Sequence, residues 1–447
     1  MSKNNRRSFI KTAAATSIAA PWIGWQTTAN SAPPSESLRF VCFGSAGRAW
    51  GNITSMAGVT NTKLVAVAEI DLARAKQTKE GFPDAKIYQD WRKLLEKEEG
   101  NFDVAIVATP DHMHAPIAMS AMQLGKHTYC EKPLTRTLHE CRTLKEYAAE
   151  NKLVTQMGIQ VGSSVGNKTG VKWLREGIVG KVTSVHSMNP KSWGSMDPLP
   201  GKIDTPPETL DWDNWIGVRP KCDYINREFH PSMWRKRLQF GTGTLGDMGC
   251  HIYHPWFQGL NQPVTLEVTS HGPGPVDDNS WPLNSKVHHK MKGNSQSDGD
   301  FDFTWYDGTQ FPGEKVAIAV GGVANIPKSG SIVIGTKGAL AIPHGGGMPK
   351  LYRDGALATD TPDPAEASSH HGQFADVIRG VSSEKPVANW DYAGPMTEAV
   401  LLGTVASRIP GETLKWDDKN LKFTNSELAN KMVKEPYREG WEVKGLS

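Results

Sequence analysis

A lysine directly after a predicted strand is the first residue of this chain with clear chemical potential. Lys132 lies in the run Glu131-Lys132-Pro133 and follows a short strand-like segment, residues 126–130. In an open α/β sheet, the carboxyl ends of the strands border the crevice where ligands bind. A lysine at that place can hold a ligand hydroxyl and help to move its proton. Lys132 is therefore a candidate catalytic residue.

Asp247 and His251 form a second candidate, because they lie four positions apart. On a helix this spacing puts both side chains on one face, and the glycine-rich approach from residue 241 suits a helix start. A neighbouring carboxylate is expected to raise the basicity of the imidazole and to fix its orientation, so that His251 accepts a proton near neutral pH. The alternative is a capping aspartate and a histidine satisfied within the core. Lys132 favours the catalytic interpretation.

Secondary-structure elements must position these candidate residues, and the sequence predicts a parallel sheet that carries Lys132. Strand-like runs at 38–43, 63–68, 104–108 and 126–130 alternate with helical stretches. Such alternation is typical of a doubly wound parallel sheet in an α/β protein. The strands and helices from 37 to 157 are therefore expected to form a Rossmann domain.

The turn after the first predicted strand is an imperfect dinucleotide-binding fingerprint. The pattern G-x-G-x-x-G starts at Gly44, but Ala46 stands at the second glycine and Ala49 at the third. The second glycine normally lets the backbone approach a pyrophosphate. We expect Gly47, the next residue, to relieve the crowding at Ala46.

An acid, Glu69, ends the second predicted strand, 25 residues after Gly44. An acid at this place in dinucleotide-binding domains accepts hydrogen bonds from the adenosine ribose and repels a 2′-phosphate. The sequence therefore predicts NAD as cofactor, in preference to NADP. Asp71 competes for this role, but we expect it to cap a helix.

Several motifs together resemble the Gfo/Idh/MocA family, which includes glucose–fructose oxidoreductase and inositol dehydrogenase. The motifs are Ala108 to His114, Gly125 to His127, Glu131 to Pro133, Gly241 to His251 and Asp391 to Val400. The resemblance covers nearly the whole chain after the first 32 residues. It implies an NAD-dependent oxidoreductase that acts on a secondary hydroxyl of a sugar or sugar derivative. It also implies a homo-oligomer whose small-molecule partner is a sugar or glycoside.

The resemblance assigns roles to particular residues. His251 would act as general base, Lys132 would orient the hydroxyl, and Asp247 would contact His251 or the substrate; Lys132 and His251 could exchange duties. The predicted cofactor-binding residues are Gly44, Ala46, Gly47, Arg48, Glu69, Thr109, Pro110, His114, Glu131, Lys132 and Gln160.

His254 departs from the family pattern, which often has an acid three positions after the active-site histidine. Pro255 follows it, and proline disfavours a helical conformation in the preceding residue. We therefore expect a bend at His254 and entry of its side chain into the substrate pocket. The spacing of Asp247, His251 and His254 would also permit a metal site, but Lys132 would repel a cation, and no metal is predicted.

The chain from 158 to 447 is predicted to form an α+β domain for substrate binding and oligomerisation. The resemblance implies a large, mainly antiparallel sheet, and the alternation at 301–306 fits one of its strands. A long stretch rich in proline and tryptophan, 189–241, precedes it, and ordered loops of such length are usually functional. Its aromatic residues suit sugar rings, although core packing or subunit contact is the alternative. The predicted substrate residues are His230, Trp234, Arg235 and His254.

Residues 1–32 are expected to be a twin-arginine export signal. The pair Arg6-Arg7 is followed by a weakly apolar stretch that is too short to span a membrane. We therefore expect a periplasmic protein without stable membrane insertion once the signal is removed. These 32 residues hold four of the 50 lysines and arginines and none of the 47 acids. The remaining chain is near neutral, which argues against a nucleic-acid partner.

Export makes cofactor supply a constraint, because free NAD is not expected to be replenished outside the cytoplasm. In one redox-neutral scheme, tightly held NAD oxidises one sugar and the NADH reduces another. In a second scheme, transient oxidation followed by elimination hydrolyses a glycoside. A catalytically inactive sugar-binding protein is the alternative from another class; Ala46 and His254 favour it, and the three predicted catalytic residues oppose it.

Overall fold

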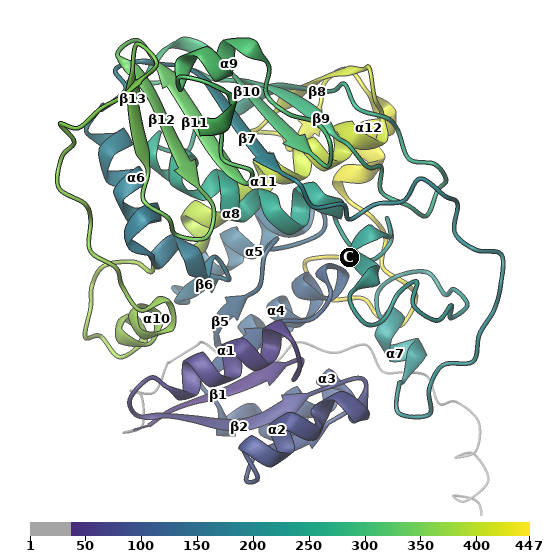
Figure 1. The fold of residues 1–447 in the computed structure, drawn as a ribbon. Helices are drawn as coiled ribbons and strands as arrows, with labels where there is room; N and C mark the ends of the chain where they lie inside the picture. The colour runs from purple at the N-terminus through teal and green to yellow at the C-terminus, as the bar shows by residue number, and fades with distance from the viewer. Residues whose placement is uncertain (1–36) are drawn as a thin grey trace, which may run out of the picture.

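The computed structural model describes residues 37–447, so the predicted signal, residues 1–32, lies outside the described residues. Figure 1 shows the two sheets on opposite sides of the folded structure, with helices between them. The first sheet has six strands in the order β3-β2-β1-β4-β5-β6, and all its pairs are parallel. This sheet confirms the predicted Rossmann fold. Its strands are β1 (Leu38–Phe43), β2 (Thr62–Ala68), β3 (Lys86–Tyr88), β4 (Val104–Val107), β5 (His127–Cys130) and β6 (Thr155–Met157).

Burial on both faces explains the continuous apolar runs of the central strands. Every residue of β4 is buried, as are five of the six in β1, because helices cover both sides of a doubly wound sheet. The order reverses between β1 and β4, which is the switch point where such sheets bind ligands. The covering helices are α1 (Arg48–Ala57), α2 (Lys76–Gly81), α3 (Trp91–Glu98), α4 (His114–Gln123) and α5 (Leu138–Glu150).

The second sheet has ten strands in the order β14-β13-β12-β11-β7-β10-β9-β8-β15-β16. Its pairs are antiparallel except β7 with β10, as predicted for a mainly antiparallel sheet, and the segment 301–306 lies in β10. The strands are β7 (Val182–Asn189), β8 (Thr265–Ser270), β9 (Lys286–Met291), β10 (Ser297–Asp307), β11 (Gly330–Gly335), β12 (Gly338–Pro343), β13 (Lys350–Arg353), β14 (Ala356–Leu357), β15 (Thr413–Asp417) and β16 (Lys422–Phe423).

Helices α6 (Val165–Arg175), α8 (Gly243–Gly259) and α11 (Trp390–Arg408) lie between the two sheets (Figure 1). Aromatic side chains fix α8 on the large sheet, since the rings of Tyr253 and Trp256 each lie 4.7 Å from that of Phe303. The amino-terminal end of α8, where Asp247 lies, is thereby held in a fixed position. The remaining helices are α7 (Trp212–Ile216), α9 (Glu314–Ala319), α10 (His370–Ile378) and α12 (Glu427–Val433).

The long stretch 189–241 is ordered by a small core of its own. Trp212, Trp215, Tyr224, Phe229 and Phe240 pack together in it, and the rings of Trp212 and Trp215 stack at 4.7 Å. For Trp212 and its neighbours, the core-packing alternative is therefore correct. In the part of the chain from residue 37 onward, no helix is long and apolar enough to cross a membrane.

Candidate active site

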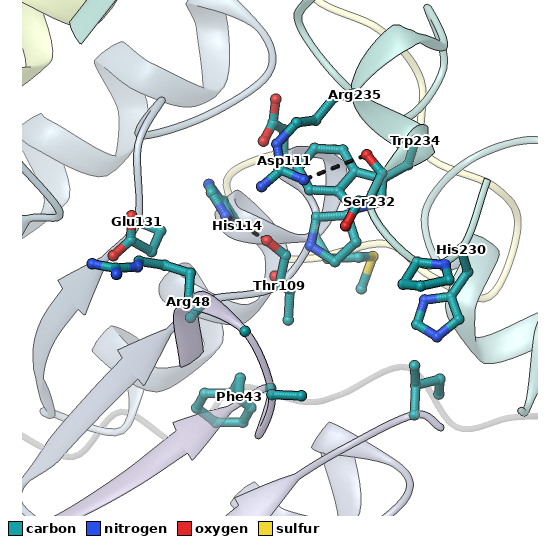
Figure 2. A pocket seen from close by; sticks show the side chains of 18 of the residues that line it. Phe43, Arg48, Thr109, Asp111, His114, Glu131, His230, Ser232, Trp234 and Arg235 are labelled. Carbon is teal, nitrogen blue, oxygen red and sulfur yellow. Dashed lines mark hydrogen bonds between the residues drawn. The ribbon is translucent and has the colours of Figure 1, made fainter. Parts of the chain in front are cut away.

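A cavity of about 650 Å³ lies at the carboxyl ends of the central Rossmann strands, within the size range of small-molecule sites. The loop 189–241 and the start of α8 form its other wall. Figure 2 shows side chains from both walls directed into it. Every residue predicted from the sequence to bind cofactor or substrate, or to catalyse, lines this cavity except His254.

The glycine loop has the backbone geometry that a dinucleotide needs. Gly44 has φ +99°, and a Cβ there would lie 2.9 Å from the Ala108 carbonyl oxygen. Gly47 has φ +59° and occupies the N-cap position of α1. Gly47 thus supplies a second residue with positive φ next to Ala46, at the start of α1. The amino-terminal end of α1 borders the cavity, where its free N–H groups suit a pyrophosphate.

Glu69 lies at the end of β2 as predicted, but its carboxylate also holds the glycine loop. Oε2 accepts from the backbone N and the hydroxyl of Ser45, both at 2.9 Å, and Oε1 accepts from the Asp71 N at 3.1 Å. Asp71 caps the next turn through the Ala73 N, which confirms its predicted capping role. Glu69 therefore positions the glycine loop, and it also lies where the adenosine ribose of a dinucleotide is expected.

His230 lies at this same end of the cavity, although the sequence assigned it to substrate. Its Nε2 is 3.1 Å from Asp71 Oδ2, and Figure 2 shows it well apart from Glu131. Burial lowers the pKa of His230, while the bond to Asp71 opposes this shift. His230 thus lies beside Asp71 and within the electrostatic reach of Glu69, at the carboxyl end of β2.

Glu131 is held by two amides. Asn52 Nδ2 and Gln160 Nε2 donate to its Oε1 at 2.9 and 2.7 Å, so Gln160 borders the cavity as a support for Glu131. A Cβ on Gly158 would lie 2.5 Å from the Glu131 carboxyl, which explains the glycine. Within the described residues, Oε2 of Glu131 and the Thr109 hydroxyl are buried without a hydrogen-bond partner. Buried polar atoms rarely stay unpaired, so both atoms fit the polar groups of a bound dinucleotide.

His114 connects the two loops on either side of this region. Its Nε2 lies 2.9 Å from the Thr109 carbonyl, and its Nδ1 lies 2.8 Å from the Pro133 carbonyl. The ring is almost fully buried. His114 therefore positions the loop that carries Lys132 against the loop that carries Thr109.

Asp247 is the centre of a cluster of donors. Lys132 Nζ donates to its Oδ1 at 2.8 Å, Arg235 Nε donates to Oδ1 at 3.1 Å, and Lys191 Nζ and Trp193 Nε1 donate to Oδ2 at 3.1 and 2.9 Å. Burial alone would raise the pKa of Asp247, but Lys132, Arg235 and Lys191 outweigh it and hold that pKa well below its usual range. Asp247 is therefore a permanently charged anchor.

His251 was predicted to be more basic than usual because of Asp247, and this prediction is wrong. The Asp247 carboxylate is occupied by the four donors, and His251 Nδ1 is buried without a partner among the described residues. Burial, then Lys132 and His344, lower the pKa of His251 well below its ordinary value, and the field of Asp247 only partly opposes them. His251 faces the cavity as a neutral imidazole, which remains able to accept a proton.

His254 does not line the cavity, and the predicted bend is absent. Helix α8 continues through His254 and Pro255, because its packing between the sheets outweighs the local preference of proline. The side chain is fully buried; its Nδ1 lies 3.0 Å from the Tyr392 hydroxyl, and a Cβ on Gly162 would lie 2.6 Å from its Nε2. Among the residues from 37 to 447, no group of three His, Cys, Asp or Glu side chains is arranged to hold a metal ion.

The sequence did not identify four residues that contact the predicted site residues: Lys191, Trp193, His344 and Asn52. Lys191 and Trp193 follow β7 directly, at the start of the stretch already singled out for its length. His344 lies in the turn between β12 and β13, with its ring 5.5 Å from that of His251. No motif marks Asn52 or His344, since only the fold brings Asn52 to Glu131 and His344 to the cavity.

The parallel sheet, the glycine loop and the adjoining cavity define the first domain as an NAD-binding Rossmann domain. Residues 39–159 match the Gfo/Idh/MocA family model, described as an oxidoreductase family with an NAD-binding Rossmann fold. The comparison therefore supports, for this part of the chain, the family that the motifs resemble.

Three similar proteins illustrate the range of this resemblance. Levoglucosan dehydrogenase from Pseudarthrobacter phenanthrenivorans is 30% identical over 42% of this chain and 40% of its own length. A glycosyl hydrolase family 109 protein from a Shewanella species is 27% identical over 36% of this chain and 37% of its own length. The aldose–aldose oxidoreductase of Caulobacter crescentus matches in structure with a TM-score of 0.56 and 16% identity, covering 85% of this chain and all of that one. The chain thus aligns with less than half the length of the levoglucosan dehydrogenase and of the glycosyl hydrolase family 109 protein.

Proposed function

We propose that this protein is an NAD-dependent oxidoreductase that acts on a secondary hydroxyl of a sugar or sugar derivative, with tightly bound NAD that is recycled within the site. One observation carries the proposal: Lys132, Asp247 and His251 line the same cavity as the glycine loop of the NAD-binding domain. The similarity to a levoglucosan dehydrogenase supports a sugar-related substrate. The domain from residue 158 onward would then bind the substrate and mediate oligomerisation.

The residues that line the cavity fit NAD, and different residues suit cofactor binding and proton transfer in an alcohol oxidation. Gly44, Gly47, Glu69, Thr109 and Glu131 would hold NAD, which supplies a hydride acceptor when bound. The alcohol must also lose its hydroxyl proton as the hydride leaves.

Lys132 and His251 suit this proton transfer. The Lys132 ammonium is fixed by Asp247 Oδ1 and by the Asp247 carbonyl oxygen at 2.6 Å, so it can donate a hydrogen bond to the substrate hydroxyl oxygen and stabilise a developing alkoxide. His251 faces the cavity and is neutral, because burial lowers its pKa. A neutral imidazole can accept the hydroxyl proton. Asp247 orients the ammonium and does not itself take up the proton.

A glycoside hydrolase is the second candidate, and the similarity to glycosyl hydrolase family 109 proteins favours it. In this scheme a transient ketone acidifies the neighbouring C–H bond, the aglycone is eliminated, water adds, and the ketone is reduced again. The two candidates differ in their products. The oxidoreductase yields equal amounts of oxidised and reduced sugar, whereas the hydrolase yields hydrolysis without net redox change.

The first experiment is to denature the purified protein and identify the released small molecules by mass spectrometry. Stoichiometric NAD is expected, followed by redox-neutral turnover of sugar pairs or aryl glycosides. Absence of dinucleotide, together with no NAD binding by calorimetry, would overturn both catalytic candidates and leave a sugar-binding protein.

We also propose export to the periplasm by the twin-arginine route, on the basis of Arg6-Arg7. Cell fractionation tests this proposal: the unaltered chain is expected in the periplasm, and an Arg6→Lys, Arg7→Lys variant in the cytoplasm. Periplasmic protein in both cases would show that another signal directs it.

A further inference from the structure

Positive side chains outnumber negative ones immediately around Asp247. Three cations, Lys132, Lys191 and Arg235, all lie against the single carboxylate of Asp247. Two other carboxylates line the cavity nearby. Asp111 accepts the Thr242 hydroxyl at 2.6 Å, and burial raises its pKa, whereas Glu131 is held by Asn52 and Gln160. Immediately around Asp247, three cations face one carboxylate, so positive charge is in excess there.

The neighbouring histidines do not change this balance. Burial is the first cause that lowers the pKa of both His251 and His344, and the nearby lysines lower it further. Both rings are therefore neutral at neutral pH. The charge that a ligand meets immediately around Asp247 is net positive.

Two of the three cations have donors left for a ligand. The Lys191 side chain is 49% exposed and reaches Asp247 with one hydrogen bond. Arg235 uses Nε on Asp247 and Nη1 on the Ser232 carbonyl; within the described chain, Nη2 makes no hydrogen bond. By contrast, Lys132 is only 12% exposed and is held by two oxygens of Asp247.

Aromatic rings hold the Arg235 guanidinium in place. Its carbon lies 4.2 Å from the Trp234 ring centre and 5.5 Å from that of Trp193. Figure 2 shows Arg235 beside Trp234 at the edge of the cavity. A guanidinium with a fixed plane can direct its free Nη2 donors at an oxygen of a carboxylate or phosphate in a charge-assisted hydrogen bond.

We infer that the substrate carries an oxyanion, the carboxylate of a sugar acid or a sugar phosphate, which Lys191 and Arg235 bind while Lys132 holds the reacting hydroxyl. The inference rests on the proposed function and narrows its substrate class. A bound sugar would displace water from Lys191 and Arg235, and a neutral sugar would supply no charge in place of that hydration. An oxyanion compensates both cations and orients the sugar.

The test compares glucuronate, glucose and glucose 6-phosphate on the NAD-loaded protein. Binding is followed by tryptophan fluorescence and calorimetry, and NAD reduction by absorbance at about 340 nm. At least one anionic sugar is expected to bind roughly tenfold more tightly than glucose, and the difference should shrink as salt increases. The two anions distinguish a carboxylate from a phosphate preference.

Two variants test whether Lys191 causes the preference for the anionic sugar. Lys191→Met is expected to remove most of the preference for the anion, whereas Lys415→Met, at an exposed lysine of β15 away from the cavity, should not. If glucose binds as tightly as both anions in the unaltered protein and reduces NAD, the inference is wrong and the proposed function stands. If an anion binds in this salt-sensitive way but no sugar reduces NAD or is hydrolysed, the anion site stands and the proposed function is wrong.

Discussion

The Lys132 ammonium donates to both a side-chain and a main-chain oxygen of Asp247, at 2.8 Å from Oδ1 and 2.6 Å from the carbonyl oxygen. One residue comes from the loop after β5 and the other from α8, so this pair joins the Rossmann domain to the helix layer of the second domain. The same contact that positions the ammonium therefore also links the loop after β5 to α8 on this side of the cavity.

Asp247→Asn is expected to lower the free energy of unfolding by about 3 kcal/mol, because it leaves Lys132, Lys191 and Arg235 without their buried counter-charge. Denaturant unfolding measures this. Asp302→Asn is the matched control: its carboxylate is 53% exposed and pairs with Lys290, so a change of no more than about 0.5 kcal/mol is expected. Equal losses in both variants would contradict the anchoring role.

The activity should show no loss of base function near the ordinary histidine pKa of about 6.5. His251 has a pKa well below its usual value, so its neutral, proton-accepting form persists as the pH falls through 6.5. The dependence of kcat/KM on pH measures this, with His251→Asn expected to lose about 100-fold in kcat. An inflection near 6.5 that disappears in His251→Asn would show a histidine of ordinary basicity.

Buried His254 makes stability depend on pH in a definite direction. Burial lowers its pKa to about 4, against about 6.5 in the unfolded chain, so the unfolded state binds more protons between these values. Stability is therefore complete above pH 6.5 and falls as the pH drops towards 4, by up to about 3 kcal/mol from this residue. Unfolding of His254→Gln should show a shallower decrease over this window. An identical slope in both proteins would refute the assignment.

Gly44→Ala is expected to weaken NAD binding and to cost about 2 kcal/mol in stability. The residue has φ +99°, and the added Cβ would lie 2.9 Å from the Ala108 carbonyl oxygen. Calorimetric titration with NAD and thermal unfolding measure the two effects. Gly313→Ala is the control, because φ there is −81° and no atom lies within 4 Å of the added Cβ. Tight NAD binding by Gly44→Ala would contradict the close approach of the cofactor to this turn.

Local sequence patterns predicted the Rossmann sheet and most of the cavity, because strand ends and glycine turns are set by nearby residues. They could not predict which side chains would donate hydrogen bonds to Asp247, because Lys191 and Arg235 lie in a long stretch without periodicity. The error at His254 has a related cause. The rule for residues before proline is local, whereas α8 continues through Pro255 and is packed on the large sheet by Tyr253 and Trp256.

Lys191 and Arg235 lie near the two ends of one excursion of the chain, 189–241, which returns to Asp247 after building its own aromatic core. Exchange of this single contiguous segment between relatives would therefore carry both oxyanion ligands together and leave Lys132 and His251 in place. Under the proposed function, replacement of this one segment is expected to change substrate preference while Lys132 and His251, which carry the proposed oxidation, stay unchanged.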